Sequence, residues 1–177
     1  MKRTKNIVVA VVIAAALLFS MTFTVSAKTT RAGLNSVEYD CLTDPGKMWM
    51  EGNILHIRGR EHVNVDVSDA PELNGINTTV ADAEINMATG FVEIRGTFRF
   101  QPEGIQGAWE GSWIFIGNKG VLNTRSVAHG TGALAGKSLF LHMYDVPYDP
   151  ITETMCAGIG IPEGTMYIEG YILDPGQ

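Results

Sequence analysis

The chain has 177 residues, a hydrophobic share of 45% and a formal net charge of −6. Beyond an apolar N-terminal segment about 150 residues remain, which suits one domain with a single core. The negative charge argues against nucleic acid and anionic membrane surfaces as partners, because both carry negatively charged phosphate groups.

The first 27 residues have the pattern of an export signal. A head with three basic residues precedes an apolar run over 7–18, and Val-Ser-Ala at 25–27 supplies the small residues that signal peptidase accepts. We expect a helical signal peptide that is cleaved after Ala27, and a secreted or periplasmic protein. An uncleaved signal anchor is the alternative. No later apolar run approaches the roughly 20 residues that span a bilayer, so we expect no stable membrane insertion after cleavage.

Residues 28–36 are polar and predict a flexible leader, and 37–177 predict a single β domain. Glycines at regular intervals separate short segments rich in Val, Ile, Phe, Trp and Thr, which is typical of consecutive strands with tight turns. The predicted strands are 37–42, 47–51, 54–67, 78–87, 91–101, 108–116, 121–129, 137–146 and 165–173. Long loops are expected over 68–75 and 147–160.

The strand predicted over 91–101 alternates most clearly. One face carries four apolar residues and the other carries charged residues and threonine, as expected when successive side chains point to opposite faces of a sheet. The apolar residues are Val92, Ile94, Phe98 and Phe100; the polar ones are Glu93, Arg95, Thr97 and Arg99. Short hairpins favour sequential antiparallel pairing. We therefore predict an all-β fold, an eight-stranded antiparallel β-barrel, with a β-sandwich as the alternative.

Two cysteines, Cys41 and Cys156, both lie in the part expected to be exported. An even pair in an oxidising compartment predicts one disulfide, which would close a loop of roughly 115 residues. The alternative is two separate buried thiols, because the sequence does not show whether the two Cβ atoms meet.

Several glycine-containing segments resemble bacterial members of the allene oxide cyclase-like barrel group, which also includes the plant dirigent proteins. The resemblance covers roughly residues 37–144. It rests on 111–114 (Gly-Ser-Trp-Ile), the run from His129 to Phe140, 48–49 with 58–59, and 96–98. It implies an eight-stranded antiparallel barrel, often a homo-oligomer, with an apolar cavity. Plant relatives cyclise an unstable epoxide or steer radical coupling, and the resemblance transfers no catalytic residue to this chain.

Motifs for cofactors and nucleophiles are absent from the sequence. The run 131–138 begins with Thr131 where a phosphate-binding loop has glycine, and a strand rather than a helix is expected after it. The four histidines lack the spacing of a metal site, and neither cysteine sits in a nucleophile motif. We therefore expect no cofactor and no metal.

The remaining candidates are charged and aromatic residues on predicted strands. Glu93 and Glu110 are catalytic candidates if both face one interior and act as a carboxylate pair. The alternative is a set of cross-strand ion pairs on the outer face, each contributing about 0.2–1 kcal/mol. Candidate ligand-binding residues are Arg95, Trp109, Trp113, Arg125 and His129.

Three functions fit this pattern. The first is an exported barrel that binds a small, mainly apolar ligand in its lumen. The second is a packed structural or assembly barrel without a cavity. The third is an enzyme of the isomerase or cyclase kind that uses the same cavity. The identity of the ligand is not encoded in any motif.

Overall fold

The structure is a computed structural model that describes residues 32–118, 121–147 and 164–175. These ranges form ten strands and one 3-10 turn, so the predicted all-β fold is confirmed. The elements are β1 (Ala32–Asp40), β2 (Leu42–Asp44), β3 (Lys47–Glu51), β4 (Ile54–Ser68), η1 (Pro71–Leu73), β5 (Gly75–Asn86), β6 (Phe91–Pro102), β7 (Gly107–Asn118), β8 (Val121–Gly132), β9 (Ser138–Pro147) and β10 (Gly164–Leu173). Helices that could cross a membrane are absent from these ranges.

Most strands lie within a few residues of their predicted bounds, and β3 has the predicted ones. The clearest difference is β1, which begins at Ala32, inside the segment predicted to be a flexible leader. It does so because all nine of its residues pair with β10. The predicted signal peptide and most of the loop predicted over 147–160 lie outside the described residues.

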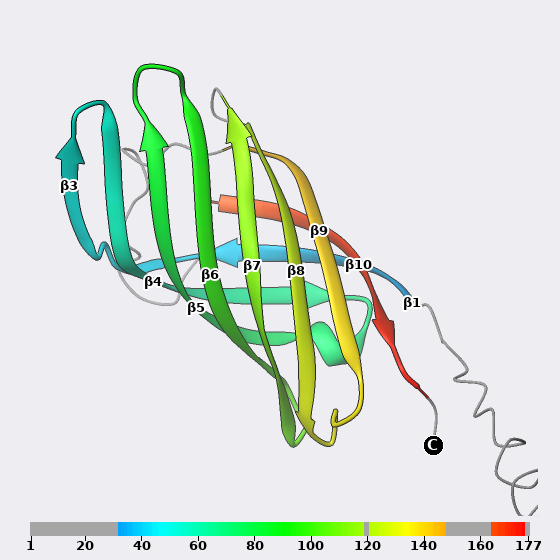
Figure 1. Cartoon of the computed structure of the whole chain (residues 1–177). Helices are drawn as coiled ribbons and strands as arrows, with labels where there is room; N and C mark the ends of the chain where they lie inside the picture. Colours follow the sequence, from blue (N-terminus) through cyan, green and yellow to red (C-terminus); the bar gives the residue numbers. More distant parts are fainter. Residues whose placement is uncertain (1–31, 119–120, 148–163, 176–177) are drawn as a thin grey trace, which may run out of the picture.

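A single antiparallel sheet wraps around the interior. Its strand order is β1-β10-β9-β8-β7-β6-β5-β4-β2, with β3 also pairing with β4. β1 has a second partner: its residues 36–39 pair with residues 65–68 of β4, the last long strand of the order. We call this four-pair ladder the β1–β4 seam. Figure 1 shows β1 and β10 crossing behind the row of strands from β5 to β9.

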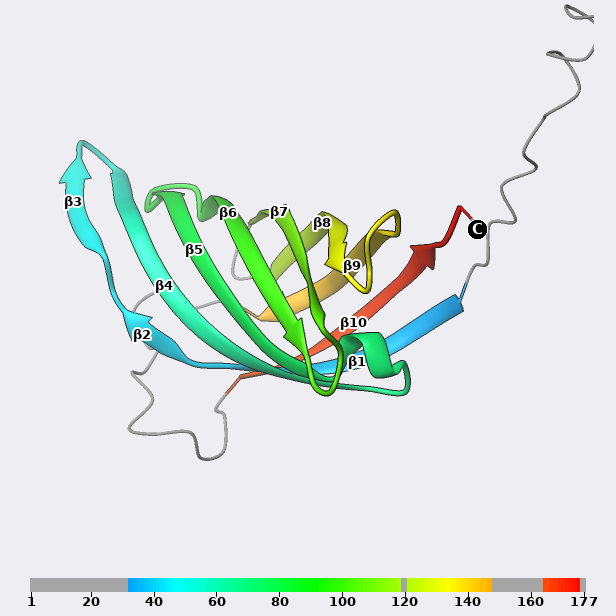
Figure 2. The same cartoon turned by 90° about the horizontal axis from the view of Figure 1, so that it is seen from below.

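A cylinder sealed along its whole length is not confirmed. Beyond the seam, β4 pairs with the short strands β2 and β3, and β3 has no second ladder among the described strands. In Figure 2 this β3 end of the sheet curves away from β9 and β10. The sandwich alternative also fits, because opposite parts of the one sheet face each other across a shared core.

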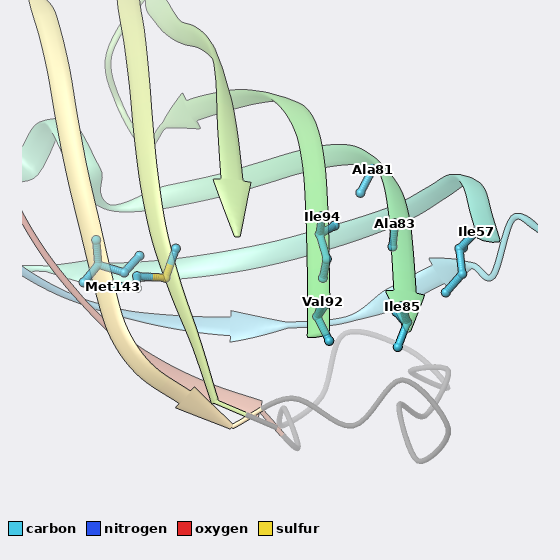
Figure 3. Close-up of a cluster of buried hydrophobic side chains, with 8 residues drawn as sticks. Ile57, Ala81, Ala83, Ile85, Val92, Ile94 and Met143 are labelled. Atoms are coloured by element: carbon cyan, nitrogen blue, oxygen red, sulfur yellow. The ribbon is translucent and has the colours of Figure 1, made fainter. Parts of the chain in front are cut away.

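Two clusters of buried apolar side chains fill the interior. The first joins Ile57 and the inner faces of β5 and β6 to Met143 of β9 and Ile168 of β10 (Figure 3). The second contains Phe98, Phe100 and the fully buried Trp109, with residues of η1, β8, β9 and β10. Val92, Ile94, Phe98 and Phe100 are all buried, so the face predicted for this strand is confirmed.

A β-bulge in β4 reverses which residues point inward. The ladder with β5 pairs Ile57 with Ala83 and then Arg60 with Ala81, so two residues of β4 lie between two consecutive inward pairs where one would normally stand. Gly59 lies in the bulge with φ +66°, a conformation that favours glycine. The inner row therefore changes from odd positions before the bulge to even positions after it, and Asn64 and Asp66 face the interior.

The close approach of Trp113 to β6 depends on Gly96, its cross-strand partner. A Cβ at position 96 would lie 2.5 Å from two ring atoms of Trp113 and 2.8 Å from the carbonyl oxygen of Val80. The ring of Trp113 packs against both apolar clusters. A side chain at position 96 would push this ring out of its place.

We predict that Gly96→Ala lowers the free energy of unfolding by about 1–3 kcal/mol, because overpacking forces the ring and backbone to move. The cost should be smaller in a Trp113→Leu background, where part of the clash is removed. Urea unfolding of the four proteins of this double-mutant cycle measures both effects. Strictly additive costs would show that Gly96 does not act through Trp113.

Cys41 is half-buried between β1 and β2, one residue after the pair that Asp40 forms with Gly164 at the start of β10. Cys156 lies outside the described residues. The disulfide between them stays a prediction from the sequence.

Candidate functional site

A group of buried polar side chains lies where strands β1, β4 and β5 meet. It consists of Glu38, Asn64, Asp66 and Asn77, each less than one tenth exposed, and we call it the acidic cluster. The strand register explains the grouping: Glu38 pairs with Asp66 across the seam, and Asn64 pairs with Asn77. Cross-strand partners point their side chains the same way, so all four face inward together.

Hydrogen bonds tie the cluster together around Glu38. The Nδ2 of Asn64 donates to Oε1 of Glu38 at 2.8 Å, and Glu38 also shares side-chain hydrogen bonds with Asp66 and Asn77. Three oxygens, the Oδ1 atoms of Asn64, Asp66 and Asn77, are buried without a hydrogen-bond partner among the described side chains. A buried acceptor left unsatisfied costs about 1–3 kcal/mol. The cluster is therefore strained, and a proton on it is favoured over a second negative charge.

Burial dominates the electrostatics of the two carboxyl groups. Desolvation, followed by the charges of Asp66 and Asp40, raises the pKa of Glu38 well above its usual range. Desolvation likewise raises the pKa of Asp66 to about 7, against the opposing hydrogen bond from Glu38. Two carboxyl groups in contact in a poorly solvated site hold at least one proton near neutral pH, as a pair rather than as separate acids.

A second acid–base pair borders the acidic cluster. The Nδ1 of His62 on β4 lies 2.9 Å from Oδ1 of Asp40 on β1. Both residues belong to the inner rows that continue from Asn64 and Glu38. Chemically, this region can hold and exchange protons. Groups of three or more His, Cys, Asp or Glu side chains that could bind a metal ion are absent from the described ranges.

The structure does not bring Glu93 and Glu110 together, so the predicted carboxylate pair is wrong. Glu93 stands opposite Ile116, whereas Glu110 stands opposite Arg99, six residues away along the hairpin. That separation is about 20 Å at the rise of a strand. Each acid instead bonds an arginine on the outer face: Glu93 lies 2.6 Å from Arg95, and Glu110 contacts Arg99. The Arg99–Glu110 pair is a cross-strand ion pair of the kind given as the alternative, whereas Glu93 and Arg95 lie on the same strand.

The five predicted ligand-binding residues also divide between the two faces. Arg95, Arg125 and His129 lie exposed on the outer face. Trp109 is fully buried, and its Nε1 donates to the carbonyl of Glu72 at 3.0 Å. Trp113 faces the interior and stays partly exposed. Because the arginines and the histidine lie on the opposite face of the sheet from the two tryptophans, the five residues do not form one site.

An open groove of about 710 Å³ crosses the outer face of the sheet from β5 to β9. Its side chains include hydroxyl groups, the Arg99–Glu110 ion pair, His129, and the exposed valines Val80 and Val127. Two sequence-predicted residues, Glu110 and His129, therefore lie together here on neighbouring strands. The groove carries a solvated ion pair, which adds little binding energy of its own.

Comparison of the chain with family models, with curated proteins and with solved structures gave no match. The resemblance to the allene oxide cyclase-like and dirigent group therefore stays a prediction from the sequence. The sequence did not predict the acidic cluster, although residues 63–67 (Val-Asn-Val-Asp-Val) alternate between apolar and polar side chains. Alternation alone would place the valines inside, whereas the bulge at Gly59 puts Asn64 and Asp66 there.

The raised pKa values predict that the folded protein loses stability as pH rises. Between about pH 4 and 7 the folded state binds more protons than the unfolded state, so the stabilisation is complete below pH 4 and is lost through pH 7. Asp66 alone would contribute about 2–4 kcal/mol of this change.

Urea unfolding between pH 5 and pH 8 measures this loss of stability, and Asp66→Asn should reduce its slope, leaving the part that belongs to Glu38. Glu110→Gln, which removes an outer-face carboxylate, is the matched control and should keep the wild-type slope. A wild-type protein as stable at pH 8 as at pH 5 would contradict the assignment.

Proposed function

We propose that the chain, after export, binds a small and mainly apolar molecule inside its wrapped sheet, without a nucleotide or a metal. The carrying observation is that four large apolar side chains pack against the buried clusters and yet stay partly exposed. They are Leu55, Trp113, Phe115 and Leu141. Apolar surface that faces the interior and remains accessible is what a small-molecule site offers.

The aromatic pair gives this surface a defined shape. Trp113 and Phe115 meet edge to face, with ring centroids 4.9 Å apart. Because Gly96 has no side chain, the Trp113 ring packs closely against the backbone of β6. A flat hydrophobic ligand would gain contact with both rings.

Two methionines extend the same apolar face to the open end of the sheet. Met48 and Met50 pair with Ile57 and Leu55, so their side chains lie on the inner side, and both are more than half exposed. Flexible thioether side chains adapt to irregular apolar surfaces. They support entry of the ligand at the β3 end, where the sheet is not joined to β9 or β10.

A second candidate function, proton-transfer catalysis of the isomerase or cyclase kind, is favoured by one observation. The carboxyl pair of Glu38 and Asp66 sits in a largely apolar interior, and burial brings the pKa of Asp66 to about 7, where a group can both accept and release a proton. Under this reading Asp66→Asn abolishes turnover of a bound substrate while its binding remains.

A packed barrel without a ligand is the remaining alternative.

We predict that N-phenyl-1-naphthylamine, a neutral apolar probe, binds with a rise in its fluorescence. Trp113→Leu should weaken binding about tenfold, because the ring supplies the largest single area of the proposed site. Trp49→Leu is the matched control: Trp49 lies on the outer side of the β3–β4 hairpin, stacked on His56, and its loss should leave binding unchanged.

Native mass spectrometry of protein purified from its own host provides the second readout. A co-purifying small molecule would identify the ligand class. Failure of the wild-type protein to bind the probe, together with the absence of any bound molecule, would contradict the proposal and favour the packed barrel.

A further inference from the structure

The β1–β4 seam is a short ladder. It contains four residue pairs, whereas the β5–β6 and β7–β8 ladders contain twelve each. Two of its four pairs turn their side chains inward, Ser36 with Ser68 and Glu38 with Asp66. The carboxyl pair is therefore one of the two inward-facing pairs that join β1 to β4.

Among the described side chains, the charged groups nearest this pair do not neutralise two negative charges. On β1 the next inward residue is Asp40, which is itself acidic and is bonded to His62 of β4. The other inward cation of β4, Arg60, lies six residues from Asp66, about 20 Å along the strand. β5 contributes the neutral Asn77 and Thr79, and β10 contributes Ile168 among its described side chains.

We propose that Glu38 and Asp66 form a pH-dependent latch on the β1–β4 seam. With one proton between them, the two carboxyl groups bond across the seam and hold it closed. With both ionised, like charges face each other in a poorly solvated site, and the four-pair ladder separates. Because β1 also pairs with β10 over its whole length, it stays attached to the sheet while its other edge opens.

Opening of the seam would regulate access to the interior, and this consequence rests on the proposed function. The latch itself does not: it is a property of the pair and the seam. Burial, followed by the charges of Asp66 and Asp40, raises the pKa of Glu38, so the pair keeps its last proton at neutral pH and loses it only at higher pH. Both asparagines that donate to Glu38 would lose this bond on opening.

Hydrogen–deuterium exchange tests the latch on the full-length mature protein. Exchange is measured at pH 6 and pH 8.5 and corrected for the intrinsic pH dependence of amide exchange. Protection of peptides covering 36–40 and 65–68 should fall at least tenfold at the higher pH, while the β6–β7 ladder keeps its protection.

Glu38→Gln and Asp66→Asn each remove the repulsion between two charges across the seam, so the pH dependence of their seam protection should be several-fold smaller than in the wild type. Glu110→Gln is the control and should behave as the wild type. Seam protection in the wild type that does not change with pH, or that changes equally in the two seam variants, would overturn the latch.

Probe binding separates failure of the latch from failure of the function. If the seam opens with pH but N-phenyl-1-naphthylamine never binds, the latch stands and the ligand-binding proposal fails. If the probe binds with the same rate at both pH values and seam protection is constant, the ligand site stands and the latch fails.

Discussion

The double pairing of β1 is the constraint on which the rest of the structure depends. A strand at the end of a sheet normally presents one unpaired edge. Here β1 gives one edge to β10 along nine residues and part of the other to β4 along four. This brings the two ends of a meander together and lets Met143 and Ile168 reach the apolar faces of β4, β5 and β6. The same contact buries Glu38 against Asp66.

Alternation along the strands then divides the chemistry between two faces. Outside, neighbouring charges pair in water, as Glu110 does with Arg99 and Arg58 with Glu84, where the Arg58 hydrogen bond lowers the pKa of Glu84. Such pairs are screened by solvent and contribute little. Inside, poor solvation raises the free energy of ionising each carboxyl group. Two such groups are therefore enough to make the free energy of unfolding depend on pH.

Much of the fold could be predicted because a hairpin is indicated by turn residues and alternation within one short stretch of the sequence. The turn at Gly52 and Asn53, and the alternation from Val92 to Phe100, needed no information from distant residues. No local pattern indicates the β1–β4 seam, because its paired residues are about 30 residues apart and are not joined by a tight turn. The site was missed for a related reason. One extra residue at Gly59 moves the valines at 63, 65 and 67 away from the inner row, and bulges are weakly marked in sequence.

The pairing of β1 with β4 is tested most directly by nuclear Overhauser contacts between backbone protons. The account predicts cross-strand contacts between residues 36–39 and 65–68 at pH 6, together with the contacts of β1 to β10. Spectra in which β1 contacts β10 alone would leave the sheet unjoined, separate Glu38 from Asp66, and contradict the account.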